Sequence, residues 1–139
     1  MYKHFGKEIL AKAVEGMGAE ADVETLFPLV YDKFVEAVDA IDNGVSQYDT
    51  DAPSRYVNNT GLASRVGSLN PSWNEESTPE IQMERFAKGM EIAYADFENC
   101  VRYLVKSWLP ARAIIEEVRA CNAIDFPDDN RCLCARLVG

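Results

Sequence analysis

The feature that most constrains the fold is an apolar stripe of helical period in the second half of the chain. Its members recur every three or four residues: Phe86, Met90, Ala93, Phe97, Val101, Leu104 and Trp108. Such spacing puts them on one face of a helix. Ser77 and Glu80 form a capping box at its start, and Pro110 interrupts it at the other end. The pattern predicts a helix over about residues 79–108 and a further helix over about residues 111–120.

The first half of the chain is also predicted to be helical. One helix spans about residues 2–15, and the side chains that we expect it to bury are Phe5, Ile9, Leu10 and Ala13. A second helix opens at Asp22, whose side chain suits an N-cap, and continues to Asp42. Because Pro28 falls inside it, we expect a kink or a restart near Phe27. No segment has a convincing strand pattern, so the predicted fold class is mainly α.

Carboxylates crowd the C-terminal end of this second helix. Asn43 and Gly44 supply a left-handed stop, so Asp39 and Asp42 share one face of the final turn. Acidic side chains there oppose the helix dipole, at a cost of about 0.3–1 kcal/mol each. A divalent cation would reverse that penalty, which makes the pair a candidate metal site. The alternative is an ordinary solvated acidic helix end.

Length and charge limit the classes of function. The 139 residues suit one domain, and the net charge of −9 argues against a broad basic surface for nucleic acid. Nine acidic residues lie between Glu20 and Asp51 against the single Lys33. No apolar run approaches the roughly 18 residues that span a bilayer. The four cysteines lack the spacing of a zinc site, which favours reduced thiols inside the cell.

A second candidate site lies where a short helix begins. The segment over residues 45–59 has no clear period and is predicted to be a loop, after which Thr60 caps a short helix to about Leu69. The free N–H groups of that helix, together with Asn58, Thr60 and Arg65, could hold a phosphate. The alternative is a plain capped helix whose Arg65 pairs with an acidic neighbour.

Three segments of the chain resemble one family. They are residues 39–48 (DAIDNGVSQY), 62–73 (LASRVGSLNPSW) and 107–112 (SWLPAR), in that order and spacing. They resemble the Myg exonuclease family, the melanocyte-proliferating-gene proteins of the DHH phosphoesterase superfamily, and are most similar to plant and algal members. The resemblance runs from about Tyr2 to about Val118, whereas residues 122–139 do not match the family.

The resemblance implies that the chain is a helical fragment of an α/β phosphoesterase. Residues 1–121 would form the helical central part and residues 122–139 a divergent, disordered tail. Family members are longer, and their N-terminal half carries the Asp-His-His motif that supplies most metal ligands. This chain has one histidine, His4, and no such motif. We therefore expect it to be inactive alone and to bind no metal tightly.

For the complete enzyme, the resemblance implies 3′–5′ exonuclease activity on RNA or short nucleotides. Two divalent ions, Mn²⁺ or Mg²⁺, would be held by Asp and His ligands. Asp39 is the preferred ligand, with Asp42 in support, and Arg112 joins the candidate substrate contacts. The family also implies a mitochondrial or nuclear location.

The resemblance also implies a binding partner for the chain. The missing half of the enzyme, or a partner protein, would cover an apolar face. The alternative function is a non-catalytic helical scaffold or assembly subunit derived from the same family.

Overall fold

The computed structural model describes residues 1–49, 55 and 58–125, with side chains as far as residue 120. Helices account for all of its regular structure. They are α1 (Tyr2–Gly16), α2 (Val23–Val30), η1 (Tyr31–Val35), α3 (Glu36–Asp42), α4 (Leu62–Gly67), α5 (Pro79–Tyr103), η2 (Leu104–Trp108) and α6 (Leu109–Asp125). No strand occurs over these ranges, so the predicted mainly α class is confirmed. The disordered tail was predicted to begin at Asn122, but α6 continues to Asp125. The rest of that tail, residues 126–139, lies outside the described residues.

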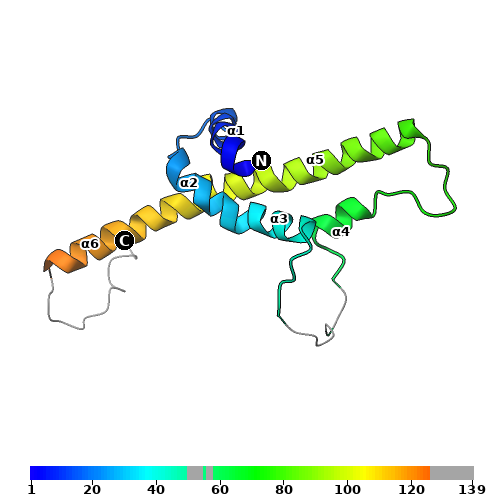
Figure 1. The fold of residues 1–139 in the computed structure, drawn as a ribbon. Coiled ribbons are helices and arrows are strands. Elements are labelled where there is room, and N and C mark those ends of the chain that lie inside the picture. Colours follow the sequence, from blue (N-terminus) through cyan, green and yellow to red (C-terminus); the bar gives the residue numbers. More distant parts are fainter. Residues whose placement is uncertain (50–54, 56–57, 126–139) are drawn as a thin grey trace.

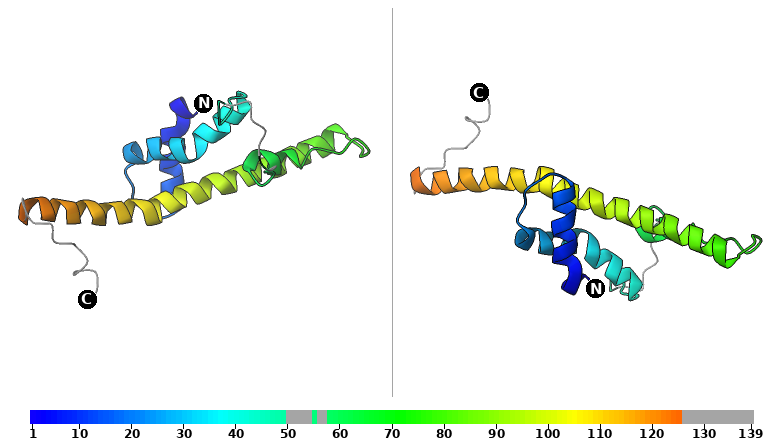
Figure 2. Two further views of the ribbon diagram at one scale, coloured as in Figure 1. Left: turned by 90° about the horizontal axis from the view of Figure 1, so that it is seen from below. Right: turned by 90° about the horizontal axis from the view of Figure 1, so that it is seen from above.

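The second half of the chain is dominated by one long helical segment, formed by α5, η2 and α6 (Figure 1). The predicted break at Pro110 is wrong. A π-helical turn precedes the proline, and the Leu109 N–H donates to the Leu104 carbonyl five residues back. Pro110 has no N–H to donate. A π turn inserted beside it lets the chain continue helically. The α6 end extends beyond the helices of the first half (Figures 1 and 2).

The core lies where α1 crosses α2 and the end of α5 (Figure 2). The buried hydrophobic residues are Leu10, Val14, Leu26, Val30, Val101, Leu104 and Val105. Tyr2 and Phe27 close one side of this core, because their rings stack with centroids 4.6 Å apart. The Tyr2 hydroxyl donates to the Phe27 carbonyl at 2.9 Å.

The buried face of α1 differs from the predicted one. Leu10 is buried as predicted and Ala13 is partly buried, but Phe5 and Ile9 are 55 % and 48 % exposed. Gly6 and Val14 are buried on the same face as Leu10. The buried positions are four residues apart and begin at a glycine, which lets the Tyr2 and Phe27 rings lie against the helix backbone. The apolar positions of α1 were compatible with either face, and this close approach at Gly6 selects one of them.

The N-cap predicted at Asp22 is confirmed. Its carboxylate accepts from the backbone N–H of Glu24 at 3.2 Å and of Thr25 at 3.1 Å. From Val23 the chain remains helical to Asp42 through α2, η1 and α3. Pro28 lies inside α2, and the departure from α-helical geometry falls in η1 rather than at Phe27.

The helix α4 packs on α5, and both of their predicted caps are displaced by one residue. The N-cap of α5 is Thr78, which accepts from the Ile81 N–H, so the capping box predicted for Ser77 is wrong. The N-cap of α4 is Gly61 rather than Thr60. The turn between the two helices is fixed by Arg85, which donates to the Leu69 carbonyl at 3.0 Å and to the Glu75 carboxylate at 2.9 Å.

Candidate functional site

The helix α3 ends as its sequence predicts. Gly44 has a φ of 68°, its N–H donates to the Ile41 carbonyl at 3.2 Å, and the Val45 N–H donates to the Ala40 carbonyl at 2.8 Å. This is the pair of hydrogen bonds typical of a Schellman C-cap. Asp39 and Asp42 therefore lie in the final turn of α3, and both are exposed.

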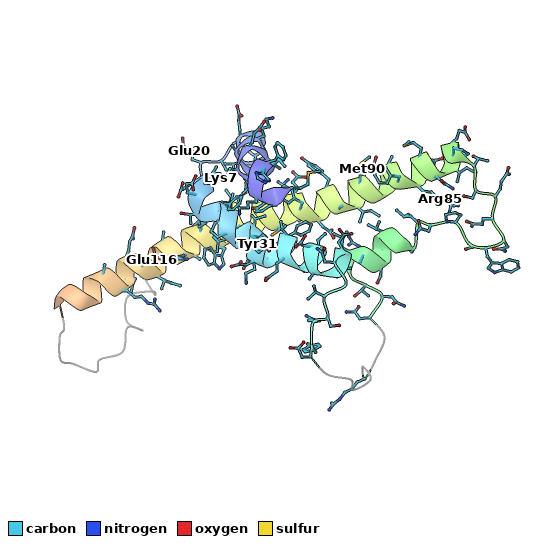
Figure 3. All side chains as sticks on the ribbon, viewed as in Figure 1. Lys7, Glu20, Tyr31, Arg85, Met90 and Glu116 are labelled. Atoms are coloured by element: carbon cyan, nitrogen blue, oxygen red, sulfur yellow. The ribbon has the colours of Figure 1, made fainter. Side chains whose placement is uncertain are left out.

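Both aspartates border a large open groove. The groove lies between α3 on one side and α4 with α5 on the other, and its volume is about 2240 Å³. Small-molecule pockets usually have volumes of about 300–1,000 Å³, so the volume of this groove exceeds that of a typical small-molecule pocket. Figure 3 shows the side chains of the two walls, with Arg85 and Met90 marked on α5.

The two carboxylates have the chemistry of metal ligands, but too few other metal-ligating side chains lie near them. In the part of the chain that the structure describes, neither Asp39 nor Asp42 forms an ion pair with a Lys, Arg or His side chain. Over the same residues, no group of three His, Cys, Asp or Glu side chains could hold a metal ion. Carboxylate oxygens suit hard divalent cations, but those cations take about six ligands. The described residues alone therefore do not make a complete metal site.

The candidate phosphate contacts are engaged with one another and with α5. The Asn58 side-chain oxygen accepts from the Thr60 N–H at 3.0 Å and from its hydroxyl at 2.7 Å. Arg65 forms an ion pair with Asp96 on α5. This is the arrangement of the alternative interpretation, in which Arg65 pairs with an acidic neighbour. The helix α4 has six residues, so its N-terminus alone is too short to argue for an anion site.

The structure separates Arg112 from these residues. Arg112 lies on α6, where its Nε donates to Glu116 at 2.6 Å and its guanidinium lies 5.3 Å from the centre of the Trp108 ring. α4 packs on α5, whereas α6 forms the other end of the long helical segment (Figures 1 and 2). Asp39, Asp42 and the start of α4 share the walls of one groove, but Asn58, Thr60 and Arg65 are not among the residues that line it.

Sequence reasoning missed Asp96 and the groove itself. Asp96 lies 31 residues after Arg65, so no local spacing connects them. Phe86 and Met90 belong to the apolar stripe predicted for this helix, and they are 63 % and 53 % exposed and line the groove. The length of the stripe was the available signal, because the remaining predicted helices were too short to cover it all.

No helix among the described residues has the length and apolar content to cross a bilayer.

Comparisons with known proteins point to one family. The family model described as MYG1 exonuclease, uncharacterised protein family UPF0160, matches residues 1–135. This match extends beyond Val118, where we expected the resemblance to end. No solved structure matches the chain.

Curated relatives agree with the family match. A "MYG1 exonuclease" of Mus musculus is 39% identical over 121 residues, which are 86% of this chain and 31% of the relative. The "MYG1 exonuclease" of Homo sapiens is 40% identical over 121 residues, with the same shares of each chain. A "MYG1 protein" of Dictyostelium discoideum is 37% identical over 116 residues, which are 84% of this chain and 35% of the relative. The chain thus spans about a third of the length of these relatives.

Proposed function

Because the chain belongs to the MYG1 exonuclease family, we propose that it is the central part of a metal-dependent exonuclease acting on RNA or short nucleotides. The mouse and human relatives carry the name exonuclease, which supports phosphodiester hydrolysis as the reaction. The chain spans only a third of them, which supports a division of the catalytic site between this part and the rest of the polypeptide. Family membership also supports our proposal of a mitochondrial or nuclear location.

The observation that carries the proposal is the position of the two aspartates. A carboxylate at a helix C-terminus is unfavourable in isolation, and none of the described cations pairs with Asp39 or Asp42. Both line an open groove, where ligands from elsewhere could approach them. We propose that Asp39 is a ligand of Mn²⁺ or Mg²⁺ and that Asp42 supports it. When bound, such ions would activate water and offset the charge on the attacked phosphate.

The local backbone holds Asp39 in a fixed place. Its carbonyl accepts from the Asn43 N–H at 3.0 Å and from the Asn43 side-chain amide at 2.8 Å. The C-cap at Gly44 then turns the chain away from the helix axis. These contacts involve the backbone rather than the carboxylate, so among the described residues both carboxylate oxygens of Asp39 stay available for a ligand.

The proposed contact for the substrate phosphate is the Arg65 side chain, with Asn58 and Thr60 in support, rather than the short N-terminus of α4. The Asn58–Thr60 hydrogen bonds order the chain just before α4, and the Arg65–Asp96 ion pair lies one turn into it. Asp96 and the start of α4 line the same groove as Asp39. A phosphate there would compete with Asp96 for the guanidinium of Arg65.

The test uses a complete enzyme that contains this chain. In a mouse chimera, the matched segment of the Mus musculus relative is exchanged for the residues of this chain. Asp39→Asn should lower manganese-dependent exonuclease activity by about a hundredfold or more, as loss of a metal ligand predicts. Glu36→Gln, one turn earlier on α3, is the matched control, because it removes the same charge from an exposed side chain outside the groove.

Folding supplies a second measurement on the same variants. Removing Asp39 or Asp42 should leave the melting temperature unchanged or slightly higher, since each charge costs about 0.3–1 kcal/mol at this helix end. If Asp39→Asn and Asp42→Asn both keep wild-type rates at limiting manganese, the acidic turn is a solvated helix end. The non-catalytic scaffold would then be the better description of this chain.

A further inference from the structure

The groove beside Asp39 is walled largely by apolar side chains. They include Phe34, Val38 and Ile41 in η1 and α3, Leu62, Val66 and Leu69 in and after α4, and Met83, Phe86 and Met90 on α5. Within each wall they recur at spacings of three and four. Each helix therefore turns an apolar face toward the groove.

Much of this apolar surface is open. Ile41, Phe86 and Met90 are 61 %, 63 % and 53 % exposed, whereas the core residues at the crossing of α1 and α5 are almost completely buried. Apolar residues scattered singly on a surface are normal, but a contiguous patch marks a site of association. Because the groove also exceeds the size of small-molecule pockets, its occupant is expected to be a polypeptide.

One candidate polypeptide is the rest of the relatives' own chain. The mouse relative has 31% of its length in the match, so more than two thirds of it lies outside. A second copy of this chain fits less well, because each copy has a net charge of −9 and would bring Asp39 and Asp42 into the shared interface. Like charges that face each other across an interface oppose association.

We propose that the groove between α3 and the α4–α5 pair is the docking surface for the part of the family polypeptide outside this chain. The inference rests on the proposed function, which it deepens by naming what covers the acidic turn. The docked part would bury Phe86, Met90 and their neighbours. It would also close the groove over Asp39, where the missing metal ligands are needed.

Cysteine labelling tests the proposal without substrate or metal. In a background with the native cysteines replaced by alanine, Met90→Cys places a thiol in the groove. Lys88→Cys places one on the other side of α5, outside the groove. Both positions are exposed, with the Met90 residue at 53 % and the Lys88 side chain at 56 %. Both variants are made in the isolated chain and in the mouse chimera, and a maleimide reagent is the probe.

We expect similar labelling rates for the two thiols in the isolated chain. In the chimera, Met90→Cys should label at least about tenfold more slowly than Lys88→Cys, because a docked surface must open locally before the thiol reacts. Equal rates in the chimera would overturn the proposal. So would slow labelling of Met90→Cys in an isolated chain that has the mass of a dimer, since a second copy would then occupy the groove.

A second chimera and the choice of labelling conditions cover the remaining outcomes. If the chimera does not fold, a second chimera that exchanges only residues 36–103 carries the same pair of cysteines. Labelling is measured without manganese or RNA. A protected groove in an inactive chimera would therefore refute the proposed reaction and leave the docking surface standing.

Discussion

At the residue scale, Tyr2 shows how one side chain ties the start of the chain to the core. Its ring stacks on Phe27, and its hydroxyl donates to the Phe27 carbonyl at 2.9 Å. Burial, and secondarily the nearby Cys100 thiol, raises the pKa of Tyr2 from 10.0 to about 12. The folded state therefore favours the protonated phenol more strongly than the unfolded chain does.

The sign of the pH dependence follows from this raised pKa. The stabilisation is fully present below pH 10 and is lost as pH rises toward about 12, since the folded state then binds more protons than the unfolded state. We predict that the free energy of unfolding falls over this interval. Tyrosinate absorbance should show a late titration step that Tyr2→Phe removes.

Cys100 also contributes to the loss of stability at high pH. Burial also raises the pKa of the Cys100 thiol, so some loss of stability at high pH should remain in Tyr2→Phe. If the variant keeps the late tyrosine step, the step belongs to another residue and the account of Tyr2 is wrong.

At the scale of elements, two glycines show how closely the helices approach. A Cβ added at Gly6 in α1 would lie 2.8 Å from ring carbons of Phe27 and Tyr2. A Cβ added at Gly89 in α5 would meet Val66 of α4 at 3.4 Å, which is ordinary contact. Both glycines are buried inside helices. The same substitution therefore tests two different helix contacts.

We predict opposite effects of alanine at these two positions. Alanine gains about 1 kcal/mol over glycine in a helix interior. At Gly6, overpacking against two stacked rings costs about 1–3 kcal/mol, so Gly6→Ala should lower the melting temperature. Gly89→Ala should leave the melting temperature unchanged or raise it. Equal shifts in the two variants, measured by thermal denaturation, would contradict the close crossing of α1 and α2.

At the scale of the whole molecule, the chain is a set of helices with one small core and an open groove. The core sits where α1, α2 and the end of α5 meet, while α6 and the far end of α5 extend away from it (Figure 1). The acidic turn lies on the groove wall rather than in an enclosed site. A catalytic centre that excludes water would need further surface over this groove.

We therefore predict that the isolated chain hydrolyses no phosphodiester. The assay offers RNA and a generic bis-phosphodiester with manganese, and the mouse chimera is the positive control. Turnover that persists in the isolated chain after rigorous removal of contaminating nuclease would contradict the proposal that the catalytic site is shared with the rest of the polypeptide.

The sequence by itself determined where the helices lie and how several of them begin and end. The Asp22 N-cap, the Asn43–Gly44 stop and the helical stripe after Pro79 each depend on contacts within a few residues, and each is present in the structure. The family also follows from the sequence, because its motifs are short sequence segments in a fixed order. Such features need no knowledge of what packs against them.

Only the tertiary structure decided which helix faces are covered. The period of an apolar stripe defines a face, but its burial depends on the partner helix. Phe5 is therefore exposed where burial was expected, and Phe86 and Met90 of the long stripe are exposed as well. The Arg65–Asp96 ion pair joins residues that only the packing of α4 on α5 brings together. The groove beside Asp39 has the same origin, because it is the space left between helices whose separation no local pattern encodes.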